Sequence, residues 1–113
     1  MNDCLFCKIV NKEIKVDIEY EDSDILAFFD IDPKAPIHIL IIPKKHIPSL
    51  NELTEGDQLI AGKILIVAKK LAKKYNLDKS GYRVVTNTGR DAGQTVNHLH
   101  FHLLGGKELG TLA

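Results

Sequence analysis

The segment over residues 98–104 constrains the fold most, because histidines alternate with apolar residues along it. It reads His98-Leu99-His100-Phe101-His102-Leu103-Leu104. Successive side chains of a β-strand point to opposite faces, so the three histidines would share one face and the apolar residues the other. A purely structural strand has little reason to collect three titratable rings on one side. The segment therefore predicts a strand that carries a functional site, with a wet, unremarkable sheet face as the alternative.

The spacing of the three rings argues against one metal ion bound by all of them. A rise of roughly 3.3 Å per residue places the Cα atoms of His98 and His102 about 13 Å apart. A histidine nitrogen must come within about 2.1 Å of zinc, so both outer rings would have to stretch past His100. We therefore expect the three rings to have different roles.

The rest of the chain predicts a mixed fold with one main helix. Runs rich in β-branched and aromatic residues, bounded by turn residues, predict four more strands at residues 18–21, 25–29, 38–42 and 82–86. Thr54 and Asp57 resemble a capping box, and apolar residues recur behind them at helical spacing: Ile60, Ile64, Val67, Leu71 and Tyr75. A short helix is expected over residues 4–10. We expect an α+β fold in one domain, residues 1–113, with a mostly antiparallel five-stranded sheet.

The balance of charges limits the classes of partner. The chain has 15 Lys and Arg against 15 Asp and Glu, so its formal net charge is zero. Long nucleic acids are held mainly by clustered cations, so we do not expect one as a partner, whereas a few local donors are enough to hold a single nucleotide. No window approaches the roughly 20 apolar residues that span a bilayer, and the first residues lack a secretory pattern. We expect a cytoplasmic protein without a membrane partner.

The pair Cys4-x-x-Cys7 is a weak signal on its own. It fits a redox pair, half of a zinc site, or two small buried apolar residues. A redox pair usually begins a helix directly after a strand, and nothing strand-like precedes Cys4. A tetrahedral zinc site needs two further ligands, which histidines elsewhere in the chain could supply.

Taken together, these segments resemble the histidine triad (HIT) family, and in particular its Hint branch. Residues 98–104 match the family signature of three alternating histidines followed by two apolar residues. Further similar segments cover nearly the whole chain: residues 3–9, 30–38, 42–47 and 93–95. The resemblance implies a HIT-like fold, a homodimer, and the activity of a purine nucleoside phosphoramidase that releases AMP or GMP from an amide or mixed anhydride.

The resemblance also implies catalytic roles. His100 corresponds to the nucleophile that forms a nucleotidyl-histidine intermediate, and His102 to the ring that contacts the phosphate oxygens. His38 corresponds to a buttress on the neighbouring strand, and Thr95 to a hydroxyl beside the leaving group. An imidazole is nucleophilic only when it is neutral and its other N–H is held by an acceptor. Neighbouring hydrogen-bond donors suit the charge on the phosphoryl oxygens, so no cofactor is required for the chemistry.

Binding residues follow from the same resemblance. Asp30 corresponds to the carboxylate that accepts the ribose hydroxyls, although an aspartate before a proline-rich turn is also a common loop cap. The base would lie among the side chains of Ile9, Phe28, Ile31 and Leu40. The phosphate would be cradled by Asn87, Gly93 and the backbone near Gln94 and Thr95.

Zinc-bearing relatives in the family imply a ligand set for the cysteine pair: Cys4, Cys7, His46 and His98. Such a structural Zn²⁺ would join the amino-terminal turn to the catalytic strand. In a metal-free alternative, His98 would belong to the hydrogen-bond network of the active site.

Two functional alternatives are a dinucleoside polyphosphate hydrolase and a nucleotide-binding regulatory module with little turnover. A zinc-dependent interaction module is a third, in which His100 would be dispensable. The chain departs from the family pattern at Asn97 and in the tail after Gly106, so the choice of leaving group does not transfer from relatives.

Overall fold

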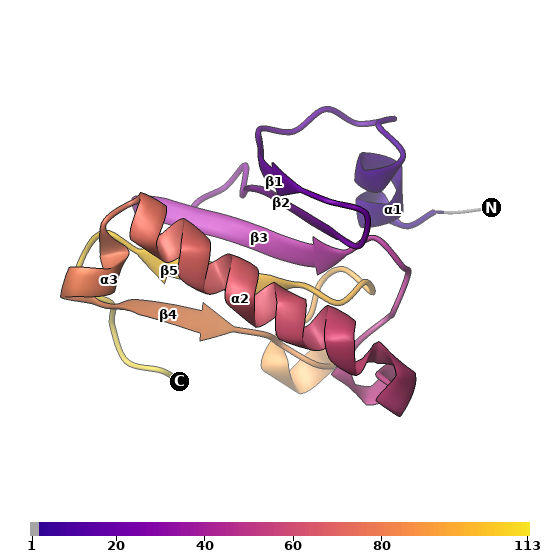
Figure 1. The fold of residues 1–113 in the computed structure, drawn as a ribbon. Coiled ribbons are helices and arrows are strands. Elements are labelled where there is room, and N and C mark those ends of the chain that lie inside the picture. Colours follow the sequence, from indigo (N-terminus) through magenta and orange to yellow (C-terminus); the bar gives the residue numbers. More distant parts are fainter. Residues whose placement is uncertain (1–2) are drawn as a thin grey trace.

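The computed structural model describes residues 3–113, and its main feature is one antiparallel sheet of five strands in the order β1-β2-β3-β5-β4. The strands are β1 (Ile18–Glu21), β2 (Ile25–Phe29), β3 (Ile37–Pro43), β4 (Tyr82–Val85) and β5 (Phe101–Gly105). The α-helices are α1 (Leu5–Val10), α2 (Gln58–Lys74) and α3 (Leu77–Ser80). Short 3-10 turns occupy Leu50–Glu52, Glu55–Asp57 and Arg90–Ala92. The expected α+β architecture, with one main helix and a short amino-terminal helix, is confirmed (Figure 1).

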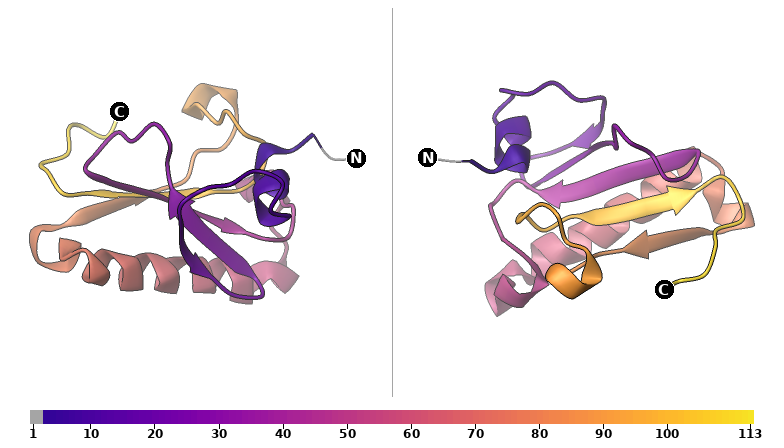
Figure 2. Two further views of the ribbon diagram at one scale, coloured as in Figure 1. Left: turned by 90° about the horizontal axis from the view of Figure 1, so that it is seen from above. Right: turned by 180° about the vertical axis from the view of Figure 1, so that it is seen from behind.

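Helix α2 covers one face of the sheet (Figure 2). Its buried side chains pack on inward-facing residues of the central strands, among them Ile39, Ile41 and Leu103, which have no exposed surface. The lysines of α2 lie mainly on its outer side, as the helical spacing predicts. None of the helices within residues 3–113 is long and apolar enough to cross a membrane.

Helix α1, the loop before β5 and the carboxyl-terminal tail lie on the other face of the sheet (Figure 2). Phe6 and Ile9 of α1 pack there against Phe28, Leu40 and Ile42. Because side chains alternate along a strand, His38 and Leu40 of β3 point to this face while Ile39 and Ile41 point to α2. The second face therefore carries the candidate site.

Two predicted boundaries are wrong in detail. The strand expected from His98 begins only at Phe101, where β5 pairs with Ile41 of β3. Pro43 has no N–H to extend the ladder, and its carbonyl oxygen accepts from the ring of His98, 2.8 Å away. The main helix begins with a 3-10 turn and becomes an α-helix at Gln58, although Asp57 does accept a hydrogen bond from the backbone of Thr54, as a capping box requires.

Candidate active site

His100 presents one ring nitrogen for chemistry because the other is occupied. Its Nδ1 lies 2.7 Å from the main-chain carbonyl oxygen of His98. A carbonyl oxygen only accepts, so Nδ1 carries the proton and the lone pair of a neutral ring lies on Nε2. His100 is 6% exposed, and Phe6 meets it edge-on with 5.1 Å between the ring centroids. The ring is thus held in the orientation that a nucleophile needs.

His102 has the opposite arrangement, which follows from a chain of hydrogen bonds. The backbone N–H of Lys34 donates to Nδ1 of His38 over 3.0 Å, so a neutral His38 carries its proton on Nε2. That nitrogen lies 2.9 Å from Nδ1 of His102 and donates to it. His102 therefore carries its own proton on Nε2 and offers an N–H at the site. His100 offers a lone pair and His102 offers a donor, with 5.1 Å between their ring centroids.

Burial keeps these rings neutral near pH 7. Burial, together with a smaller effect of the neighbouring rings of His100 and His38, lowers the pKa of His102 to about 4. Burial also lowers the pKa of His38, against the raising effect of the Asp30 carboxylate. Since both rings stay neutral, the directions of the hydrogen bonds described above hold across the physiological pH range.

Asp30 serves as the loop cap that its sequence context predicts and also lies at the site. Its Oδ1 accepts from the backbone N–H of Asp32 over 2.8 Å. Its Oδ2 lies 3.4 Å from Nε2 of His38, and the side chain is 20% exposed. One carboxylate oxygen therefore orders the loop while the other faces the rings and the adjoining cavities.

An apolar cavity of about 330 Å³ ends at these rings. Its lining includes all four residues expected around a base, together with the expected ribose and phosphate contacts: Ile9, Phe28, Ile31, Leu40, Asp30, Thr95, His100 and His102. Ile9, Phe28 and Leu40 are buried, whereas Ile31 is 99% exposed and stands at the rim. A flat apolar group attached to a polar one fits such a cavity.

The glycine-bearing loop before the triad is more ordered by internal bonds than the sequence predicts. The N–H of Gly93 donates to Arg90, and the N–H of Gln94 donates to the carbonyl oxygen of Gly89. The side chain of Gln94 donates to the carbonyl oxygens of Pro48 and Val96. The backbone N–H groups of Gly93 and Gln94 are therefore already bonded within the loop, and the expected cradling of a phosphate by Gly93 and by the backbone near Gln94 and Thr95 stays a prediction.

Asn87 and Thr95 lie where the loop meets the rings. Thr95 is exposed and lines the apolar cavity, while both residues line a second cavity that also includes His102. Thr95 thus lies where the two cavities meet, and His102 lines both of them as well.

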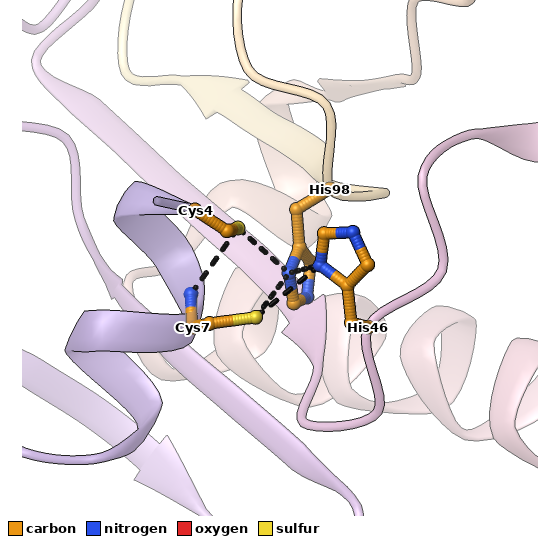
Figure 3. Close-up of side chains that lie close together, drawn as sticks. All are labelled: Cys4, Cys7, His46 and His98. Carbon is orange, nitrogen blue, oxygen red and sulfur yellow. Dashed lines mark hydrogen bonds between the residues drawn. The ribbon is translucent and has the colours of Figure 1, made fainter. Parts of the chain in front are cut away.

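The four predicted metal ligands converge in space (Figure 3). Cys7 lies in α1 and Cys4 is the N-cap of that helix, while His98 precedes β5 and His46 lies in the loop after β3. The Nδ1 of His98 lies 3.4 Å from Sγ of Cys4 and 3.6 Å from Sγ of Cys7. The Nδ1 of His46 lies 3.2 Å from Sγ of Cys7 and 3.2 Å from Nδ1 of His98.

These distances fit a tetrahedral ion. Zinc bonds of about 2.3 Å to sulfur and about 2.0–2.1 Å to nitrogen require about 3.4 Å between two ligand nitrogens and about 3.5 Å between nitrogen and sulfur. His98 also has the correct tautomer, because its Nε2 donates to Pro43 and leaves Nδ1 bare. Burial lowers the pKa of His98 to about 4, which keeps that nitrogen available.

A second group of metal-binding side chains, Asp30, His38 and His102, does not fit an ion as well. A neutral ring that binds metal through Nε2 carries its proton on Nδ1. In His38 that atom already accepts from Lys34, so the two requirements conflict. This group is better described as a hydrogen-bond relay.

Sequence reasoning missed Phe6 as a site residue. Its ring lies edge-on to both His98 and His100, and it lines the apolar cavity. A signal was present: if Cys4 and Cys7 share a metal with His98, a residue between the two cysteines must lie near the triad.

The middle histidine of the triad offers a lone pair and the last offers a hydrogen-bond donor, next to a five-stranded antiparallel sheet. This arrangement defines the histidine triad class of site. A model of the HIT domain family matches residues 11–109. The chain belongs to this family. The matched residues begin after α1, so they do not include the two cysteines.

Known proteins are similar to the chain over nearly all of its length. The purine nucleoside phosphoramidase of Escherichia coli (strain K12) is 44% identical over 108 residues, covering 96% of this chain and 91% of that protein. A HIT family hydrolase from Legionella pneumophila Philadelphia 1 has a TM-score of 0.94 and 50% identity, with 96% of each chain covered. A histidine triad protein from Clostridium difficile also has a TM-score of 0.94, with 46% identity over 100% of this chain and 98% of that one.

Proposed function

We propose that the protein hydrolyses amides of purine nucleoside monophosphates through a covalent intermediate on His100. The observation that supports this most directly is the bond from His100 Nδ1 to the His98 carbonyl oxygen, which leaves Nε2 as a lone pair at the end of the cavity. The E. coli relative is named for this activity, and the Legionella neighbour is named a hydrolase.

In the first step, Nε2 of His100 attacks the α-phosphorus while the bond from phosphorus to the amine breaks. The amine nitrogen takes the electron pair of that bond and a proton from water, and leaves. The Nε2–H of His102 donates to a phosphoryl oxygen, where negative charge is spread in the transition state. In the second step, water attacks phosphorus, loses a proton, and returns the electron pair to Nε2. The products are the nucleoside monophosphate and a neutral His100.

Substrate binding is assigned to the apolar cavity and its polar end. The base lies among Ile9, Phe28 and Leu40, with Ile31 over the rim, and the free oxygen of Asp30 accepts from the ribose. Asn87 and the Thr95 hydroxyl contact the phosphate and the leaving group. Gly93 and Gln94 shape the loop, and the backbone at Thr95, which follows Gln94, supplies donors to the phosphate.

A zinc ion held by Cys4, Cys7, His46 and His98 has a structural role in this proposal. Four protein ligands close the coordination sphere and leave no position for a reacting water. The residues of α1 then fix the wall of the cavity, because Phe6 lies between two of the ligands in the sequence and contacts both His98 and His100.

The proposal includes a homodimer and a cytoplasmic location, as the family implies. The outer side of α2 carries Leu59, Leu65 and Ile66, which are 83%, 54% and 52% exposed, and a second copy would cover them. Size-exclusion chromatography with light scattering measures the mass directly. A monomer at working concentrations would contradict this part of the proposal.

The activity is tested by measuring AMP release from adenosine 5′-phosphoramidate by the wild type and by His100→Ala. We expect turnover by the wild type and a loss of about 10³-fold or more in the variant, because the nucleophile is removed. Lys73→Ala, on the outer side of α2, is the control and should match the wild type. Binding of AMP without turnover would favour a nucleotide-binding regulatory module. Faster cleavage of diadenosine polyphosphates than of the phosphoramidate would favour a dinucleoside polyphosphate hydrolase. Equal turnover by the wild type and His100→Ala would contradict the mechanism.

A further inference from the structure

A second cavity, of about 500 Å³, adjoins the first at the reacting position. The two cavities share Asp30, Thr95 and His102 and otherwise have separate linings. If the nucleoside occupies the apolar cavity, the group displaced from phosphorus cannot lie there as well. The second cavity is then the place for the leaving group.

Arg83 lines this second cavity from the edge strand β4. It pairs with Leu104 across the ladder to β5, and the next pair on the same face is Val85 with His102. Arg83 and His102 are thus diagonal neighbours on one face, about 7–8 Å apart, a distance that a long side chain can cover. The guanidinium group is therefore within reach of a ligand bound at His102.

The charge of Arg83 is not neutralised within the part of the chain that the structure describes. No carboxylate of residues 3–113 forms an ion pair with it, and its recorded polar contact is from Nη2 to the carbonyl oxygen of Gly110, 3.0 Å long. Lys34, the other cation of the cavity, is paired with Asp32 over 2.9 Å. A guanidinium group has five N–H donors in a planar fork, so most of its donors are available to an anion.

The contact to Gly110 also shapes the cavity. It holds the carboxyl-terminal tail as the tail turns back past β4 (Figure 2), and Leu112 then forms part of the lining. Val85 and Leu104 provide further apolar surface below the guanidinium group. Beside the polar side chains that it shares with the reacting position, the cavity thus has apolar surface next to a cation that pairs with no carboxylate of residues 3–113.

We propose that Arg83 selects leaving groups that carry an anion, a carboxylate or a phosphate, on a short aliphatic linker. This inference rests on the proposed function, because it assigns the amine side of the same reaction. The anion binds the guanidinium group and takes no part in bond breaking. The bond from phosphorus to nitrogen breaks as described above, and the amine leaves with its anion unchanged.

The test compares two amides of AMP that differ in charge, one made with β-alanine and one with β-alanine amide. The ratio of kcat/KM for the anionic over the neutral substrate is measured for the wild type, Arg83→Gln and Arg83→Lys. We expect Arg83→Gln to lower this ratio by about tenfold or more, the value of a charge-assisted hydrogen bond, and Arg83→Lys to lower it less. Lys73→Gln removes the same charge far from the cavity and should keep the wild-type ratio. An unchanged ratio in Arg83→Gln would overturn the inference.

Binding to the His100→Ala protein separates this inference from the proposed function. Calorimetry with both amides measures their affinity ratio, with and without Arg83→Gln, when no turnover is possible. An Arg83-dependent preference for the anionic amide, with no turnover by the wild type, would support the anion site while the proposed function fails. Turnover by the wild type with no Arg83-dependent preference would support the proposed function and overturn the anion site. An amide of aminoethyl phosphate, run in parallel, distinguishes a phosphate from a carboxylate as the preferred anion.

Discussion

The main-chain carbonyl oxygen of His98 lies 2.7 Å from Nδ1 of His100, while the side chain of the same His98 belongs to the Cys4, Cys7 and His46 group. One residue thus links the candidate metal centre to the nucleophile through its own backbone. The link explains how alternating histidines on one segment take different roles. His98 faces the metal group, His100 the cavity, and His102 the relay from His38.

The first prediction concerns the tautomer of His100. Because the His98 carbonyl oxygen can only accept, the free protein at pH 7.5 should carry the His100 proton on Nδ1, and His102 should carry its proton on Nε2. Nitrogen-15 NMR of histidine-labelled protein distinguishes the two tautomers by their ring nitrogen shifts. Equal shifts for the Nε2 atoms of the two rings would be inconsistent with the assigned hydrogen bonds.

The second prediction concerns the metal. Cobalt(II) added to the metal-free protein should give the intense visible bands of a tetrahedral site together with a sulfur-to-cobalt charge-transfer band. Cys7→Ser should lower the metal affinity by about 100-fold or more, because the ligand itself is removed. His102→Gln alters the other histidine group and serves as the matched control, with an unchanged cobalt spectrum. Bands that disappear in His102→Gln and persist in Cys7→Ser would show that the ion binds at Asp30, His38 and His102 instead.

The third prediction follows from the pKa of His102, which burial lowers to about 4 from about 6.5 in the unfolded chain. Between these two pH values the unfolded chain binds one more proton at His102 than the folded chain does. The contribution of the neutral His102 ring to the free energy of unfolding is therefore complete above pH 6.5 and is lost as the pH falls towards 4. The free energy of unfolding of the metal-free protein should therefore fall with decreasing pH through this window.

Replacing His102 by Gln should reduce that slope by the contribution of one proton, about 1.4 kcal/mol per pH unit. Urea unfolding of the wild type and His102→Gln at several pH values between 4 and 6.5 measures the difference. The comparison holds the other buried histidines constant, so parallel profiles for the two proteins would show that the pKa of His102 is not lowered.

The fourth prediction separates binding from stability at the rim of the cavity. Ile31 is 99% exposed and lines the apolar cavity, so Ile31→Ala should leave the melting temperature unchanged and raise the Kd for AMP roughly 3- to 10-fold through lost apolar contact. Leu50→Ala, at a 47% exposed position outside this cavity, is the control. The account of the base site would be wrong if both variants bound AMP equally well.

Much of the fold could be predicted from the sequence, because periodicity is local. Alternation in residues 98–104 and the helical spacing behind Thr54 depend on neighbours in the chain, and both elements are present. The start of β5 was not predictable, because it depends on the missing N–H of Pro43 and on the bond between the N–H of Leu99 and the carbonyl oxygen of Ile47. Those partners come from distant parts of the sequence.

The candidate site was predictable to a similar degree and for the same reason. Residue types in the histidine strand and the cysteine pair identified the chemistry. The contacts of Gln94 with Pro48 and the position of Phe6 against two histidine rings depend on tertiary packing. Arg83 carried no signal at all, because an arginine on an edge strand is usually only a solvated cation.

The central claim is the covalent role of His100, and trapping the intermediate tests it most directly. The protein is mixed with adenosine 5′-phosphoramidate, quenched in base within the first turnover, and mapped by peptide mass spectrometry. We predict an adenylate on the peptide that contains residues 98–102, located on His100 by fragmentation and absent from His100→Ala. Turnover without any adduct in the wild type, or an adduct located on His102 or Thr95, would contradict the account.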